Sequence, residues 1–346
     1  MAKRNDLKKL SRYVNGRSLS VYRRAFDYSQ KQIEECKTAV SEYLRHEGLN
    51  PAEICVVIVG SVGRYEALSA SDIDLIPVGK TQNALTEEMD AGLRRTVGEA
   101  LRDKKVSAGK QLTRFVAVDQ LTAPESIGGH SDSPEALTQR MLILSEGAQA
   151  GGDFALDEIR SRILAVYADE ERTSGRNLLS LCNDLARYYR RLCIDYKAKI
   201  DLEDKDWCTR NIKLRHSRKF WYFSTILAVA AGARRPGREE DAFRRSLLKD
   251  FAKPPCLRLL HAVPKHLRAA SGRLLESFAW FLDFMSRSEN RAALAAVPYQ
   301  DRYDVSTSNP FPALKYNSEL LHREMLGLLE ALDRPLRHRV LDWFLL

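Results

Sequence analysis

The sequence lacks several features that mark particular classes of protein. Its six cysteines form no Cys-x-x-Cys pair and have no histidines at zinc-ligand spacing, which argues against a zinc-binding fold and indicates reduced, structural cysteines. No apolar run approaches the roughly 20 residues of a membrane-spanning helix, and the first residues lack the apolar core of a signal peptide. Internal repeats and long low-complexity segments are absent too. We therefore expect a cytoplasmic globular protein with no membrane partner.

The composition is that of a chain able to form a large core. The sequence has 346 residues, of which 44% are hydrophobic and 29% charged, and this length favours two domains. The net charge of +9 is unevenly placed: 21 basic and 20 acidic residues lie within 1–150, and 34 basic and 26 acidic residues follow. The basic second part could face nucleic acid, a nucleotide or an acidic protein, or could serve solubility alone.

The first part of the chain alternates helical and strand patterns. Apolar residues in 18–46 follow helical spacing, which predicts an amphipathic helix. Ile54–Val59 has the length and β-branched content of a buried strand, and Ile73–Val78 and Thr113–Val118 predict two more. These patterns indicate an α+β protein that begins with a mixed sheet flanked by helices.

From about Ser133 the patterns become helical, for example in Asn211–Ala231 and Leu314–Asp333, and we expect no further strands. Gly147 and the pair Gly151–Gly152 are the expected joint between two domains. The sequence therefore predicts a first domain over residues 1–145, which includes the helix at 18–46, and an α-helical domain over 146–346.

A small-residue turn follows the first predicted strand. Gly60 and Ser61 begin the run Gly-Ser-Val-Gly-Arg-Tyr-Glu, which opens a short helical segment. Glycine lets the backbone approach a phosphate closely, and the serine hydroxyl adds a donor. The turn has the chemistry of a triphosphate-binding loop, although it is not a Walker A loop because no Gly-Lys-Ser/Thr follows.

Two carboxylates come next. Asp72 and Asp74 are two residues apart at the start of an extended segment, so both should project from one face while Ile73 and Leu75 project from the other. Carboxylate oxygens together with substrate phosphates suit Mg²⁺, and two such ions could align an attacking oxygen with an α-phosphorus. Asp119, which follows the third predicted strand, is the candidate for a third acid that holds metal and accepts a proton.

Basic residues could complete the nucleotide site. Arg64, close to the turn, is a candidate phosphate contact, although it could instead pair with Glu66. Lys213 lies in the acid-free basic stretch 207–219, which could face the nucleotide phosphates or an RNA backbone. The same stretch could be a solvated helix face that balances nearby acids.

The order Gly60-Ser61, short spacer, Asp72-Ile73-Asp74 and later acid resembles the DNA polymerase β-like nucleotidyltransferase superfamily. Within it, Gly-Ser-x-Gly-Arg-x-Glu followed by Ser-Asp-x-Asp is most similar to the branch that contains the uridylyltransferase of the PII nitrogen-signalling protein. The resemblance covers about residues 55–80. It implies a mixed sheet flanked by helices, an NTP donor and two Mg²⁺ ions, with Mn²⁺ as a substitute.

By motif position, the resemblance implies that Gly60 and Ser61 contact the triphosphate and that Asp72 and Asp74 bind metal, with Asp119 carried over provisionally. The predicted function is transfer of an NMP from an NTP to a protein or RNA acceptor, tRNA included, with release of pyrophosphate. Two alternatives stay open: a catalytically idle module that binds nucleotide or RNA, and a synthase that makes nucleotide second messengers.

Overall fold

The computed structural model describes residues 4–102, 104–107, 113–123, 127, 132–168, 178–203, 206–232, 240–306 and 308–344. Helices make up most of these residues, and a small mixed sheet of four strands supplies the remaining regular structure. The chain is therefore an α+β protein, as the sequence predicts. No helix in the described ranges is both long and apolar enough to cross a membrane.

The chain forms two compact units, each assembled from several stretches. Described residues of the first unit lie within Ala25–Asp184 and Arg235–Pro254, and those of the second lie within Lys3–Arg24, Leu185–Arg234 and Pro255–Leu346. The division passes through helices α1 and α7. The single boundary expected between residues 145 and 146 stays a prediction, because compactness does not report which segments fold alone.

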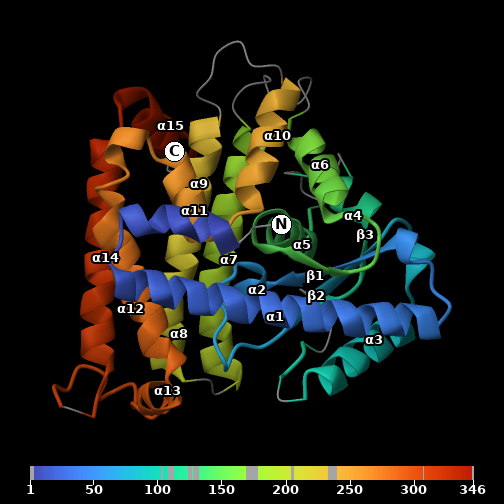
Figure 1. Cartoon of the computed structure of the whole chain (residues 1–346), viewed down its shortest axis with the longest axis horizontal. Helices are drawn as coiled ribbons and strands as arrows, with labels where there is room; N and C mark the ends of the chain where they lie inside the picture. Colours follow the sequence, from blue (N-terminus) through green and yellow to red (C-terminus); the bar gives the residue numbers. More distant parts are fainter. Residues whose placement is uncertain are drawn as a thin grey trace. The chain divides into compact units, whose positions relative to one another are not determined.

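The first unit contains the sheet and the helices around it (Figure 1). In chain order its elements are most of α1 (Gly16–His46), η2 (Pro51–Glu53), β1 (Ile54–Val59), α2 (Gly60–Gly63), β2 (Asp74–Gly79), η3 (Gln82–Ala84), α3 (Glu87–Ala100), β3 (Val116–Ala117), α4 (Val118–Thr122), α5 (Pro134–Glu146), β4 (Ala148–Gly151), α6 (Leu156–Tyr167) and α10 (Glu240–Phe251).

The strand order in the sheet is β3-β2-β1-β4. β1 is antiparallel to both of its neighbours, and β3 runs parallel to β2 at one edge. All six residues of β1 are buried, which explains why its apolar pattern is continuous rather than alternating. β1 therefore lies in the interior of the sheet and ends directly at Gly60.

Two of the strand predictions need correction. The strand expected at Thr113–Val118 is only Val116–Ala117, because Val118 already begins α4. The expectation of no strand after Ser133 is wrong, since β4 pairs with β1.

β4 escaped prediction because it consists of Ala, Gln, Ala and Gly, which have low strand propensity. Side chains of α1 and β1 leave no room for larger residues at Gly151 or at Gly147, the residue before β4. A Cβ at Gly151 would lie 2.3 Å from Cγ1 of Val40 on α1, and one at Gly147 would lie 2.6 Å from Cγ1 of Val57 on β1.

The second unit has helices and no strand among its described residues (Figure 1). Its elements are η1 (Arg4–Arg12), the start of α1, most of α7 (Leu179–Glu203), α8 (Trp207–Lys213), the π-helical turn η5 (Leu214–Arg218), α9 (Lys219–Gly232), α11 (Pro255–Ala262), η6 (Lys265–Leu267), α12 (Ser271–Ser286), α13 (Ser288–Ala295), α14 (Phe311–Ala331) and α15 (Arg334–Phe344). Aromatic side chains fill its core; Phe220 stacks on Phe278 with 4.2 Å between ring centroids.

Candidate functional site

The turn after β1 brings Gly60 against the carboxylate of Asp74. Val59, the last residue of β1, pairs with Asp74, the first residue of β2. Gly60 has φ +70°, and a Cβ at this position would lie 3.1 Å from Oδ2 of Asp74. Ser61 follows, half-buried, and its carbonyl accepts a hydrogen bond of 2.9 Å from the Glu66 amide, which closes the turn. The structure thus places the glycine of the predicted phosphate loop beside one of the predicted metal ligands.

Asp72 and Asp74 alternate with buried residues. Asp72 is exposed and Asp74 is half-buried, whereas Ile73 and Leu75 are completely buried. This is the alternation expected of an extended segment that covers the core with one face. The two carboxylates therefore belong to the more accessible side of the segment.

Residues 105–107 lie beside these acids, and none of the three is acidic. The Ile73 amide donates to the Lys105 carbonyl at 2.9 Å, and the Ser107 amide donates to the Ile73 carbonyl at 2.8 Å, so Ile73 and Val106 form a parallel bridge. Lys105 and Ser107 therefore lie next to the Asp72–Asp74 segment. Residues 105–107 give no strand signal in the sequence, because Val106 is their only apolar residue.

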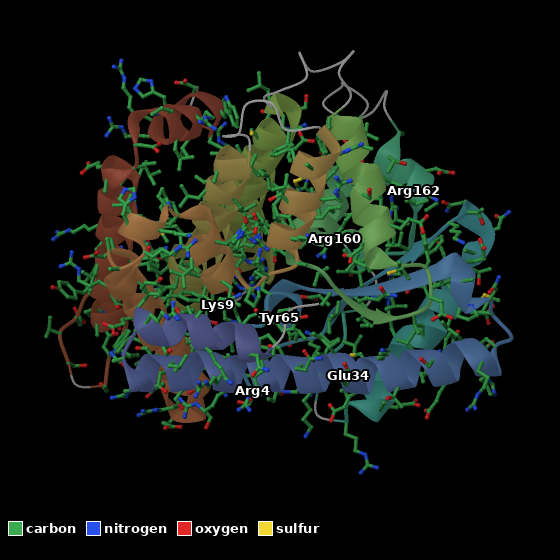
Figure 2. The ribbon with its side chains drawn as sticks, turned by 45° about the horizontal axis from the view of Figure 1, so that its top comes forward. Arg4, Lys9, Glu34, Tyr65, Arg160 and Arg162 are labelled. Carbon is green, nitrogen blue, oxygen red and sulfur yellow. The ribbon has the colours of Figure 1, made fainter. Side chains whose placement is uncertain are left out.

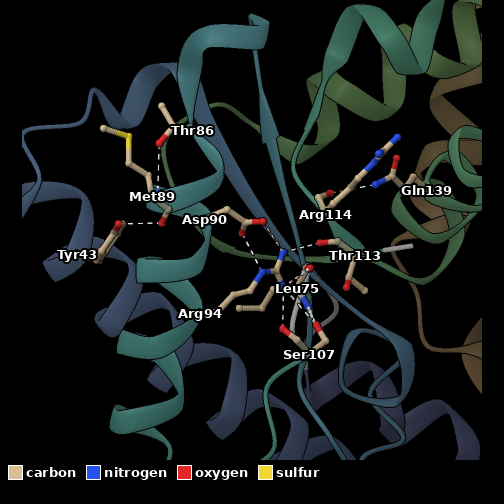
Figure 3. Close-up of polar contacts among 10 residues, drawn as sticks. All are labelled: Tyr43, Leu75, Thr86, Met89, Asp90, Arg94, Ser107, Thr113, Arg114 and Gln139. Atoms are coloured by element: carbon tan, nitrogen blue, oxygen red, sulfur yellow. Dashed lines mark hydrogen bonds and ion pairs between the residues drawn. The ribbon is translucent and has the colours of Figure 1, made fainter. Parts of the chain in front are cut away.

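Arg94 on α3 holds this arrangement together (Figure 3). One terminal nitrogen donates to the carbonyls of Leu75 and Ser107, each at 3.1 Å. The other donates to the Thr113 carbonyl at 2.5 Å and to Oδ2 of Asp90 at 3.2 Å. The buried guanidinium therefore ties β2, immediately after Asp74, to residues 105–107.

Asp119 is not brought to Asp72 and Asp74. β3 runs parallel to β2 with Ala117 opposite Gly79, so Asp119 follows the end of β2 whereas Asp74 begins it. The five residue steps from Asp74 to Gly79, at about 3.3 Å each, put about 16 Å between the two ends of β2. Among the residues that the structure describes, no group of three or more His, Cys, Asp or Glu is placed to hold a metal ion. The sequence located Asp119 after an apolar run but could not reveal the direction of that run in the sheet.

Arg64 is buried and paired with carboxylates, and its role as a phosphate contact stays a prediction. Its side chain is 3% exposed, its Nε donates to Oε2 of Glu66 at 3.1 Å, and it forms an ion pair with Glu146 at the end of α5. Two carboxylates therefore balance the guanidinium away from solvent. Arg64 thus joins the α2 turn to α5. It forms the pair with Glu66 that the sequence offered as an alternative, and a second pair with Glu146, which is distant in sequence.

Tyr65 is buried next to Arg64 in the sequence. It has φ +60°, an uncommon conformation for a residue other than glycine, and its ring stacks on Phe26 at 4.8 Å. Burial raises the pKa of Tyr65; the Arg160 charge opposes this shift and the Glu34 charge adds to it (Figure 2). Burial also lowers the pKa of Arg160 to about 10, and its guanidinium donates to the Gly147 carbonyl at 2.5 Å.

Lys213 is exposed at the end of α8 in the second unit, and its role toward a nucleotide stays a prediction. Its basic neighbours already have partners: Arg215 pairs with Glu319 at 3.2 Å, and Arg210 lies 5.6 Å from the ring centre of Tyr196. These contacts agree with the alternative of a partly balanced helix face.

The carboxylates of Asp72 and Asp74 fit a magnesium ion better than a metal that needs a complete protein cage. Mg²⁺ usually binds one or two carboxylates and completes its coordination with phosphate oxygens and water. Gly60 lies beside Asp74, where a Cβ would come within 3.1 Å of Oδ2, and a glycine allows a close approach to its backbone. The donor set therefore fits Mg²⁺ delivered together with a nucleotide.

Comparison with models of known protein families and with curated proteins gives no match for this chain. The candidate site is therefore defined by its own residues, above all by the proximity of Gly60 and Asp74.

Proposed function

We propose that the chain is a Mg²⁺-dependent nucleotidyltransferase that moves an NMP from an NTP to a hydroxyl of a protein or RNA. The observation that carries this proposal is the contact between the Gly60 backbone, at φ +70°, and the carboxylate of Asp74, with Asp72 two residues earlier. A backbone that a phosphate can approach, next to two hard oxygen ligands, meets the needs of a magnesium triphosphate.

The residues have separate roles in the proposed reaction. Asp72 and Asp74 hold Mg²⁺, which neutralises phosphate charge, while Gly60 and Ser61 contact the triphosphate. The acceptor oxygen forms a bond to the α-phosphorus as the bond from that phosphorus to the bridging oxygen breaks. Pyrophosphate leaves with the bonding electron pair, and the acceptor proton passes to water.

The test is an incubation of the protein with each α-labelled NTP, Mg²⁺, and total cellular RNA or protein. We expect label transfer with at least one donor, and its loss in an Asp72→Ala/Asp74→Ala double variant. A Glu87→Ala/Glu88→Ala double variant is the matched control, since it removes the same charge from exposed positions on α3. Absence of transfer with every donor, or transfer that persists in the Asp72/Asp74 variant, contradicts the proposal.

A second candidate function is a module that binds nucleotide without transferring it. This alternative is favoured by the segment beside the acids, where Lys105 and Ser107 take the place of a third carboxylate, and by the distant position of Asp119. Phosphoryl transfer with two metal ions needs oxygen ligands for both ions. Mg²⁺-dependent NTP binding without label transfer would select this alternative.

A further inference from the structure

Lys105 lies beside Asp72 on the side of the segment away from the core. Ile73 and Val106 are partners in a parallel bridge, so their side chains share one face. Asp72 and Lys105 each come one residue earlier, which places both on the opposite face. Both residues are exposed, in agreement with this placement.

Among the described residues the ammonium of Lys105 has no partner, in contrast to that of Lys104. Lys104 contacts the Ser69 carbonyl in the loop before Asp72 and lies 5.2 Å from the ring centre of Tyr28. Lys105 has no ion pair or side-chain hydrogen bond with the described residues, although it lies next to an exposed carboxylate. The position therefore combines an unused cation with the predicted metal ligands.

The backbone that carries Lys105 is held in place from below. The Lys105 carbonyl accepts a hydrogen bond from the Ile73 amide. Two residues further along the chain, a terminal nitrogen of Arg94 donates to the Ser107 carbonyl and, at 3.3 Å, to the Ser107 hydroxyl (Figure 3). Because Arg94 also bonds the Leu75 carbonyl, the lysine segment and the aspartate segment share one buried anchor. The register between Lys105 and Asp72 is thus built into the core.

We propose that Lys105 is a phosphate-binding residue of this site and takes the place assigned to Arg64 by the sequence pattern. The inference rests on the proposed binding of a magnesium nucleotide at Asp72 and Asp74. A lysine ammonium is a compact charge with three donors, suited to the terminal phosphates of an NTP or to inorganic tripolyphosphate. We assign Lys105 to a phosphate group rather than to a macromolecule, because it lies next to the proposed metal ligands.

The test measures equilibrium binding of inorganic tripolyphosphate and of each NTP, in Mg²⁺ and in EDTA, to five proteins: wild type, Asp72→Ala/Asp74→Ala, Lys105→Ala, Lys105→Arg and Lys37→Ala. Lys37 is a matched control because it is exposed on α1 and unpaired among the described residues. We expect Lys105→Ala to weaken binding of tripolyphosphate about tenfold, the size of one charge-assisted contact. Lys105→Arg should retain most of the affinity, and Lys37→Ala should bind like wild type.

Three outcomes would overturn the inference. Equal binding by wild type and Lys105→Ala, together with loss of binding in Asp72→Ala/Asp74→Ala, would reject Lys105 and leave the proposed function standing. A similar loss in Lys37→Ala would reduce the effect to general charge. Absence of Mg²⁺-dependent binding in the wild type would reject the proposed function and Lys105 together. Circular dichroism of each variant excludes unfolding as the cause.

Discussion

At position 60 the backbone conformation and the neighbouring carboxylate both require glycine. We expect Gly60→Ala to lower the free energy of unfolding by about 1–2 kcal/mol, because alanine is strained in the left-handed region. The same change should weaken Mg²⁺-dependent NTP binding, since the new Cβ would press on Asp74. Urea unfolding and calorimetric titration measure the two effects.

The matched control is Gly327→Ala, at an exposed helical position where a Cβ meets no atom within 4 Å. This variant should be unchanged in binding and slightly more stable. If Gly60→Ala binds nucleotide as well as Gly327→Ala does, the glycine does not serve a phosphate.

His216 makes stability depend on pH. Its Nδ1 donates to the Ile212 carbonyl at 2.9 Å, its Nε2 accepts from the Asn317 amide at 3.0 Å, and its ring stacks on Phe281. Burial lowers its pKa from 6.5 to about 3. The unfolded chain therefore binds a proton that the folded chain refuses as pH falls below 6.5, so stability is full above pH 6.5 and declines below it.

The expected slope is about 1.4 kcal/mol of unfolding free energy per pH unit between pH 6 and pH 5. His216→Asn should flatten this slope, even if it lowers stability at every pH. His261→Asn, at an exposed site, should keep it. An identical slope in wild type and His216→Asn would contradict the assignment. His216 is thus a core residue with both ring nitrogens bonded.

Among the secondary-structure elements, the join between α2 and α5 depends on the pair Arg64–Glu146. Arg64→Met would leave two buried carboxylates without their cation, so we expect a loss of about 3–5 kcal/mol in unfolding free energy. Arg162→Ala, which breaks the half-exposed pair with Glu158, should cost less than about 1 kcal/mol. Equal losses in the two variants, measured by urea unfolding, would show that the buried pair is not a structural join.

Elements with strong local patterns were predictable from the sequence. β1 is six apolar residues long, and α1 buries its apolar residues at helical spacing, so each could be recognised without knowledge of its partners. β4 and the bridge at Val106 could not, because their extended conformation comes from pairing with β1 and β2 rather than from strand-forming side chains.

For the whole molecule, contacts between distant residues decide which site predictions hold. Gly60 lies near Asp74 because β1 and β2 are neighbouring antiparallel strands, with Val59 opposite Asp74. Arg64 is 82 residues from Glu146, and the parallel direction of β3 takes Asp119 to the other end of the sheet. Sequence spacing contains neither fact, and it also gave no reason to choose Lys105.

We propose that Gly60, Asp72 and Asp74 bind a nucleotide together with magnesium, whether or not transfer follows. Its most direct measurement is NTP binding by isothermal titration calorimetry, in Mg²⁺ and in EDTA, to the wild type and to an Asp72→Asn/Asp74→Asn variant. We predict binding of at least one NTP by the wild type that requires Mg²⁺ and is lost in the double variant. Binding that is equal in Mg²⁺ and EDTA, or equal in the two proteins, would contradict the claim.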